Sequence, residues 1–135
     1  MFYQCPLNKN HHNFDNVEAH TLNLDKLFET FESTLSNFDS ELGMANSRAR
    51  IRMTTLYQVA AANKGIVVGT GNKVEDFGVG FYTKYGDGGV DISPIADCNK
   101  SEVWEIGKSI NILQEIIDAA PTDGLWDDGR TDEGQ

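Results

Sequence analysis

The fold is decided by residues 65–76, which read GIVVGTGNKVED. Residues 65–68 form a short apolar run beside glycines, which predicts a buried strand that leads directly into a glycine turn. At the carboxyl end of a parallel strand, backbone amides and the next helix N-terminus face the crevice where open α/β sheets bind ligands. A threonine, an asparagine and an acid in that turn can reach a nucleotide or its metal ion. The stretch therefore predicts a nucleotide site.

A second polar stretch follows closely, at residues 81–91, FYTKYGDGGVD. It adds a lysine, Lys84, a glycine-rich turn and a further acid, Asp91, all within reach of one small ligand. We expect both stretches to contribute to the same site.

Helical spacing of apolar residues predicts two helices upstream of this site. One begins near Asp25 and Lys26, and residues 36–45 after it are expected to form a loop. Asn46 or Ser47 then caps a second helix, which ends at a C′ glycine, Gly65. Residues 17–22 alternate in polarity and predict a short strand.

Basic residues crowd the first turns of the second helix, at Arg48, Arg50 and Arg52. Cations are disfavoured at a helix N-terminus by the helix dipole, so a bound anion is one explanation for them. Solvated arginines are the alternative, and the sequence leaves both open.

Downstream, Asn99 and Glu102 have the spacing of a capping box. Lys100 then falls in the first turn of a helix, beside free backbone amides, where a lysine can bind phosphate or simply remain exposed. Residues 112–120 predict one more short helix. The alternation of strands and helices indicates an α/β fold with a parallel sheet flanked by helices.

Length and charge limit the function classes. The chain has 135 residues and a net charge of −10, which fits a single domain and argues against nucleic-acid or anionic-membrane partners. The two cysteines, Cys5 and Cys98, lack the spacing of a disulfide framework or a zinc site, so we expect a reduced, cytoplasmic protein. Within the domain, residues 1–16 are expected to form an N-terminal arm and residues 121–135 a flexible acidic tail.

Four blocks of sequence, in order, resemble the ammonia-dependent NAD synthetases, which are ATP pyrophosphatases. The blocks are NSRARIRM, GTGNKVED, TKYGDGGVDISPIAD with NKSEVWEIGK, and APTDGLW. The resemblance covers the chain from about residue 17 to its end. It implies a Rossmann-like adenine nucleotide alpha-hydrolase fold and a ligase that adenylates deamido-NAD with Mg-ATP and lets ammonia displace AMP, giving NAD, AMP and pyrophosphate.

The resemblance also implies roles for individual residues. Deamido-NAD would be bound by Arg50, Lys84 and Asp91. ATP would be bound by Thr70, Lys100 and Thr122, and Mg²⁺ by Glu75, with Asp76 as the alternative because the spacing after the GTGNK turn differs from that of many relatives by one residue. No protein nucleophile is implied, since catalysis would be positioning and charge stabilisation.

One family motif does not occur in these residues. The pyrophosphate loop, Ser-Gly-Gly-x-Asp-Ser, is absent from the sequence, so the fold is expected to be incomplete and to correspond to the central and later part of such an enzyme. A homodimer, or a complementing N-terminal fragment, is the expected partner. The alternatives are half of a split synthetase, a non-catalytic nucleotide-binding remnant, and an ATP pyrophosphatase with another acyl acceptor.

Overall fold

The computed structural model describes residues 15–119. The chain divides into two compact units, Asn23–Val103 and a second unit made of the residues on either side. All of the predicted site residues except Thr122 lie in the first unit, and Thr122 lies outside the described residues. The same is true of Cys5 and of the arm and tail predicted at the two ends, apart from residues 15 and 16 of the arm.

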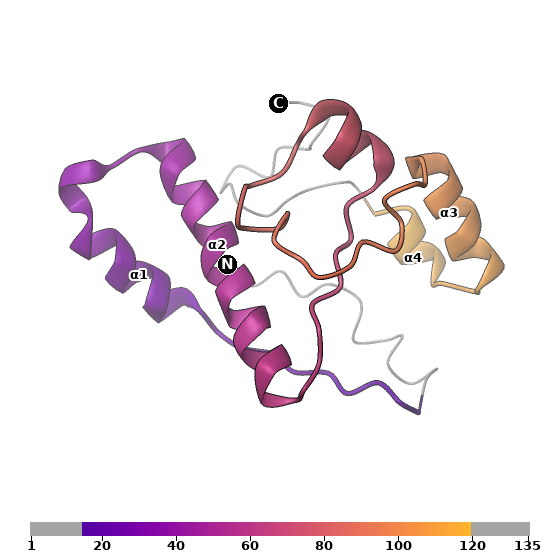
Figure 1. The fold of residues 1–135 in the computed structure, drawn as a ribbon, viewed down its shortest axis with the longest axis horizontal. Helices are drawn as coiled ribbons and strands as arrows, with labels where there is room; N and C mark the ends of the chain where they lie inside the picture. The colour runs from indigo at the N-terminus through magenta and orange to yellow at the C-terminus, as the bar shows by residue number, and fades with distance from the viewer. Residues whose placement is uncertain (1–14, 120–135) are drawn as a thin grey trace. The chain divides into compact units, whose positions relative to one another are not determined.

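Helices dominate the first unit (Figure 1), which holds α1 (Asp25–Thr34), the 3₁₀ turn η3 (Ser36–Phe38), α2 (Glu41–Ala62) and the π-helix η4 (Lys73–Val79). The predicted helix at Asp25 is confirmed as α1. Its apolar spacing turns Phe28 and Phe31 toward partial burial, and the guanidinium of Arg48 on α2 lies 4.4 Å from the centroid of the Phe28 ring.

The helix α2 begins earlier than the sequence predicted. Residues 41–45 belong to α2 and not to the predicted loop, because Ser40 caps the helix by accepting the Gly43 N–H at 3.2 Å. Residues 36–40 connect the two helices through η3. Neither Asn46 nor Ser47 is the cap. A glycine three residues after Ser40 hides this start, because glycine is a poor helix former.

The end of α2 also differs in detail. The left-handed position is Lys64, with φ 55°, and not Gly65. The Gly65 N–H donates to Ala60 O at 2.8 Å and the Lys64 N–H to Ala61 O at 3.3 Å. This is the hydrogen-bond pattern of a Schellman motif, in which Gly65 is one residue beyond the C′ position.

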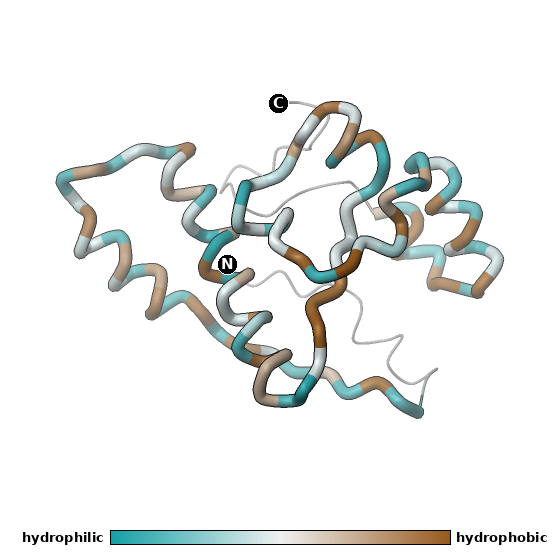
Figure 2. Tube along the Cα trace, viewed as in Figure 1, coloured by the Kyte–Doolittle hydropathy of each residue, from teal (hydrophilic) through white to brown (hydrophobic). Residues whose placement is uncertain are grey.

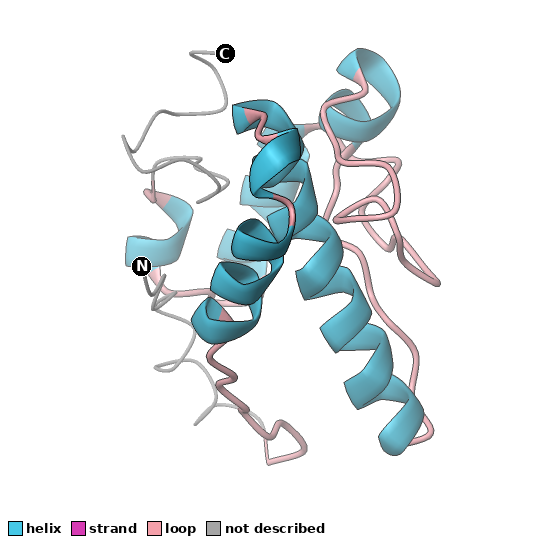
Figure 3. Cartoon of the chain, turned by 90° about the vertical axis from the view of Figure 1, so that its left-hand side faces the viewer, coloured by secondary structure: helices cyan, strands magenta, loops and turns pink. Residues whose placement is uncertain are grey.

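The predicted strands are the largest difference. Residues 17–22 form no strand, and residues 15–119 contain no extended ladder (Figure 3), only one parallel bridge between Val68 and Ile92. The apolar run at 66–68 is visible in Figure 2. Val67 is 6% exposed, but Ile66 and Val68 are 59% and 53% exposed. The bridge has the parallel direction that the sequence predicted, and a sheet is not observed because no second strand runs alongside.

The second unit is small. It contains the part of α3 (Lys100–Ser109) from Trp104 onward. It also contains α4 (Gln114–Ile117), which is shorter than the helix predicted at 112–120. A Cβ at Gly107 would lie 3.8 Å from Ile117 Cγ1 and 3.9 Å from Ile112 Cβ, which is ordinary van der Waals contact. No helix among residues 15–119 combines the length and the apolar character that crossing a bilayer requires.

The cap of α2 can be tested by substitution. Ser40→Ala removes the acceptor for the Gly43 N–H and should lower the free energy of unfolding by about 1 kcal/mol. Ser47→Ala is the matched control, because the Ser47 hydroxyl donates to Gly43 O inside the helix at 2.8 Å and caps nothing. Urea unfolding followed by circular dichroism measures both. An equal or larger loss in Ser47→Ala would contradict the observed start of the helix.

Candidate functional site

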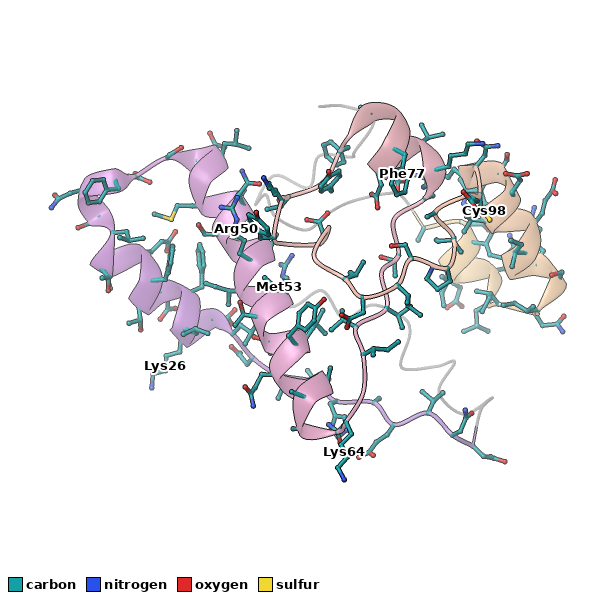
Figure 4. All side chains as sticks on the ribbon, viewed as in Figure 1. Lys26, Arg50, Met53, Lys64, Phe77 and Cys98 are labelled. Carbon is teal, nitrogen blue, oxygen red and sulfur yellow. The ribbon has the colours of Figure 1, made fainter. Side chains whose placement is uncertain are left out.

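One face of α2 holds the loop of residues 83–91. The face consists of five residues at positions i, i+3, i+4, i+7 and i+11, and we call it the α2 stripe: Asn46, Ala49, Arg50, Met53 and Tyr57. Residues at this spacing lie on one side of a helix. Figure 4 labels Arg50 and Met53, which lie on the side of α2 that faces the loop.

Polar contacts fix the two ends of the loop to the stripe. At its start, the Thr83 hydroxyl donates to Asn46 Oδ1 at 2.6 Å, and Arg50 Nε donates to Lys84 O at 3.1 Å. At its end, the Tyr57 hydroxyl donates to Asp91 Oδ1 at 3.1 Å. Because these contacts are local to one helix face, the spacing of Lys84 and Asp91 along the helix is set by α2.

The glycines of the loop allow the middle of it to approach the helix. A Cβ at Gly86 would lie 2.9 Å from the Ala49 Cβ, and one at Gly89 would lie 3.1 Å from the Met53 Cγ. Real side chains do not pack at the first of these distances, so Gly86 has to be a glycine unless the backbone moves. The contact is as close as it is because neither glycine carries a side chain.

The loop is a compact turn stabilised by its own backbone. Thr83 is 7% exposed; its N–H donates to Asp87 Oδ1 at 2.9 Å, and its carbonyl accepts the Gly86 N–H at 2.9 Å. Tyr85 adopts φ 62°, a left-handed conformation that costs a residue with a side chain free energy. The Lys84 ammonium lies 5.1 Å from the centroid of the Tyr85 ring. The geometry leaves Lys84 exposed at the surface of the turn.

Asp91 joins three segments. Its Oδ2 accepts the Val67 N–H at 2.7 Å, and its own N–H donates to Val67 O at 2.9 Å. With the Tyr57 hydroxyl on Oδ1, the carboxylate connects the end of the loop to α2 and to the apolar run at 66–68. It still has unused lone pairs, since an ionised carboxylate offers about four acceptor positions.

The glycine-containing segment 69–72 lies beside the same bridge. The Gly69 N–H donates to Ile92 O at 2.8 Å. Asn72, which is 5% exposed, caps η4 by accepting the N–H groups of Val74 and Glu75 at 3.0 and 3.1 Å. Thr70 is exposed in this segment. Residues 69–72 form no hydrogen-bonded turn, so the predicted glycine turn is not observed, and the helix after them is the π-helix η4.

The two acids of η4 face different partners. Glu75 Oε1 pairs with Lys100 Nζ at 3.1 Å, and both side chains are about one-third exposed, 32% and 33%. The Asp76 carboxylate lies against Gly71, where a Cβ would collide with it. The side chain that faces the 69–72 segment is therefore Asp76, whereas the sequence favoured Glu75.

Negative charge accumulates around Asp76. Partial burial, and then the charges of Asp87 and Glu75, raise the pKa of Asp76 above its ordinary value. Within residues 15–119, no set of three or more histidine, cysteine, aspartate or glutamate side chains is arranged to hold a metal ion. Mg²⁺ is commonly bound through one or two carboxylates together with substrate phosphates and water, so Glu75 or Asp76 fits as a single ligand.

The contact made by the acidic residue of the capping box predicted for α3 is confirmed. Glu102 Oε2 accepts the Asn99 N–H at 2.7 Å, and α3 begins at Lys100. Lys100 therefore lies in the first turn of the helix, as the sequence predicted, but its ammonium is paired with Glu75 and is not free.

The sequence missed three residues that shape this site. They are Tyr57, Asn46 and Asp87, none of which was given a role in the loop. Polar groups at both ends of the α2 stripe could have indicated Asn46 and Tyr57, because a buried apolar face does not need polar ends.

A family model described as NAD synthase matches residues 9–135. A protein named NH(3)-dependent NAD(+) synthetase from Carboxydothermus hydrogenoformans is 43% identical over 124 residues, which are 89% of this chain and 50% of the relative. One of the same name from Alkaliphilus oremlandii is 42% identical over 135 residues, 99% of this chain and 50% of the relative. The chain spans about half the length of these relatives.

Solved structures agree with the sequence matches. The structure of NMN synthetase from Francisella tularensis is 39% identical with a TM-score of 0.81, covering 87% of this chain and 49% of that one. The NH3-dependent NAD synthetase of Campylobacter jejuni is 31% identical with a TM-score of 0.69, covering 76% and 44%. The chain shares its fold with part of these enzymes.

The charge around Asp76 can be tested by its effect on stability. Because the pKa of Asp76 is raised in the folded state, its ionisation costs stability as the pH rises through that pKa. Asp76→Asn should therefore be more stable than the wild type at pH 7, and the difference should shrink as the pH falls toward the ordinary value of 3.8. Urea unfolding across this range measures it.

Asp39→Asn is the matched control for charge. Asp39 is exposed, so its substitution removes one negative charge from an acidic chain without relieving the contacts of Asp76. A stabilisation of equal size in both variants would show that net charge alone is responsible.

Proposed function

Because the chain belongs to the NAD synthase family, we propose that it takes part in the amidation of deamido-NAD with ammonia, which gives NAD and converts ATP to AMP and pyrophosphate. The observation that carries the proposal is the loop at 83–91. It presents a lysine and an aspartate at fixed positions along α2, which suits a ligand with an anionic part and a hydrogen-bond donor.

The chemistry of the two side chains assigns them different parts of the substrate. Lys84 is exposed and held only by a cation–π contact, so it can turn to a phosphate or carboxylate oxygen. Asp91 is an acceptor, and its charge would repel those same groups. It is suited to a hydroxyl or amino group of the dinucleotide, which donates to the lone pairs left by Tyr57 and Val67. Arg50 has donors remaining after its Nε bonds to Lys84 O.

ATP is assigned to the 69–72 segment and the start of α3. Thr70 offers an exposed hydroxyl there, and Lys100 lies at the first turn of α3. The proposal includes Thr122 by resemblance alone. The Lys100 ammonium has three N–H donors and gives one to Glu75, so donors remain for a phosphate.

The residues proposed here bind and orient, and none of them forms a bond to the substrate. Mg²⁺, bound through Glu75 or Asp76 and the phosphates of ATP, would supply neutralisation of negative charge. The nicotinate carboxylate attacks the α-phosphorus, pyrophosphate leaves, and ammonia then displaces AMP. Lys84 and Lys100 lower the repulsion between the two anionic substrates, which is positioning and electrostatic catalysis.

The finer fold assignments belong to the same proposal. We place the Val68–Ile92 bridge in a parallel sheet of the Rossmann-like adenine nucleotide alpha-hydrolase type, within one domain spanning residues 1–135. The proposed partner is a second copy of the chain or a complementing N-terminal fragment. A cytoplasmic location stays a prediction from the cysteines.

A mononucleotide substrate is the second candidate. It is favoured by the similarity to the NMN synthetase of Francisella tularensis, at a TM-score of 0.81. The two candidates differ in the presence of an adenylate group on the substrate, so they can be separated by comparing deamido-NAD with nicotinic acid mononucleotide in one assay.

The first experiment is ATP–pyrophosphate exchange by the purified chain with Mg²⁺, with and without deamido-NAD. Exchange that depends on deamido-NAD supports the enzyme directly. Exchange that appears only with nicotinic acid mononucleotide supports the second candidate. Binding of deamido-NAD in a calorimeter without exchange, alone or with an added Ser-Gly-Gly-containing fragment, would favour a nucleotide-binding module, and no binding of either nucleotide would contradict the proposal.

Lys84→Ala tests the site within that experiment. Loss of a charged hydrogen bond to the substrate should weaken deamido-NAD binding about tenfold or more. Lys26→Ala is the matched control: Lys26 is an exposed lysine of α1, and Figure 4 shows it on the other helix. Equal weakening in both variants would mean that general charge, and not the 83–91 loop, binds the nucleotide.

A further inference from the structure

The Asp91 carboxylate is held from two sides. Val67 N–H donates to Oδ2 at 2.7 Å, and the Tyr57 hydroxyl donates to Oδ1 at 3.1 Å. The first donor belongs to the backbone and is present whatever side chain stands at position 67. The second depends entirely on Tyr57, which is half-buried on α2.

We infer that Tyr57 is a positioning residue that fixes the plane of the Asp91 carboxylate, so that the two remaining acceptor positions point in a defined direction. For the ligand, this inference rests on the proposed function, in which Asp91 accepts a donor of deamido-NAD. For the carboxylate itself, it rests only on the two hydrogen bonds.

Two hydrogen bonds on different oxygens restrict the carboxylate in a way that one cannot. With the Val67 N–H alone, the group can rotate about the Cβ–Cγ bond while keeping one contact, because terminal torsions of this kind are broad. The hydrogen bond from the Tyr57 hydroxyl prevents this rotation. Binding a ligand to an acceptor that is already fixed costs less conformational entropy than binding to an acceptor that must first be ordered.

The hydroxyl is suited to remain a donor. Partial burial, followed by the hydrogen bond to Asp91 and the negative charge of Asp91, raises the pKa of Tyr57 above 10.0. The phenol is therefore protonated at neutral pH. Donation from Tyr57 to Asp91 does not switch off across the range in which an enzyme of this family would work.

The spacing of the stripe makes the contact specific. Tyr57 follows Met53 by one helical turn, and Met53 packs on Gly89, two residues before Asp91. One turn of α2 therefore matches the length of the loop from Gly89 to Asp91, which places the Tyr57 hydroxyl beside the Asp91 carboxylate at the end of the loop. A phenylalanine would preserve the ring and remove only the donor.

Amide hydrogen exchange on the full chain tests the positioning directly, without a ligand. In Tyr57→Phe, exchange at the Val67 N–H should be about threefold to tenfold faster, the loss expected for one hydrogen bond of ordinary strength. The Gly69 N–H is the internal reference, because it donates to the backbone oxygen of Ile92. Its exchange should not change.

Tyr82→Phe is the matched control, since the Tyr82 hydroxyl has no hydrogen-bond partner among residues 15–119. It should leave exchange at Val67 unchanged. An unchanged Val67 rate in Tyr57→Phe would overturn the inference. So would equal acceleration at Val67 and Gly69, because Tyr57 would then only stabilise the unit as a whole.

Calorimetry adds the ligand. Tyr57→Phe should weaken deamido-NAD binding about threefold to tenfold and leave ATP binding unchanged, while Tyr82→Phe changes neither. Unchanged deamido-NAD affinity beside faster Val67 exchange would overturn the role toward the substrate. If the wild type binds no deamido-NAD, the proposed function fails, and the exchange rates still decide whether Tyr57 positions Asp91.

Discussion

The hydrogen bonds of Asp91 are the constraint on which the described unit depends. The carboxylate joins the loop to Tyr57 of α2 and to the Val67 N–H, and the backbone of Asp91 pairs with Val67 O. Without them, the apolar run at 66–68 would be connected to the loop only through the hydrogen bonds that Ile92 makes. A charged acceptor gives stronger hydrogen bonds than a neutral one, so one side chain holds three segments that are distant in sequence.

The α2 stripe turns a flexible sequence into a defined surface. Glycine-rich loops lose more conformational entropy on folding than other segments, and the 83–91 loop contains three glycines. Contacts at Asn46, Ala49, Arg50, Met53 and Tyr57 compensate for that loss at intervals of one helical turn. The same glycines allow the loop to come close enough to α2 for the contacts to form. A glycine-rich segment that would be flexible alone is therefore ordered against the helix.

Local signals explain what the sequence could predict. The apolar spacing of α1 and the Asn99–Glu102 capping box each depend on residues a few positions apart. The start of α2 was missed because Gly43 interrupts the pattern. The strand predicted at 17–22 is not observed, because alternation alone does not provide a neighbour to pair with. The Glu75–Lys100 pair joins residues 25 apart. Such a contact follows from the fold and not from any local pattern, so the sequence assigned the two side chains to different ligands.

The cations of the site are not equally available to an anion. Lys100 is paired with a carboxylate at 3.1 Å, and Arg50 uses one donor on Lys84 O. Lys84 is held only by its contact with the Tyr85 ring, and exposed cation–π contacts contribute about 0.5–1 kcal/mol. In a chain with a net charge of −10, an approaching anion is repelled except where a cation can turn toward it. Lys84, which is exposed at the surface of the turn, can do so at the lowest cost. An anionic nucleotide would therefore contact the 83–91 loop first, whereas at Lys100 the neighbouring Glu75 carboxylate offsets part of the positive charge.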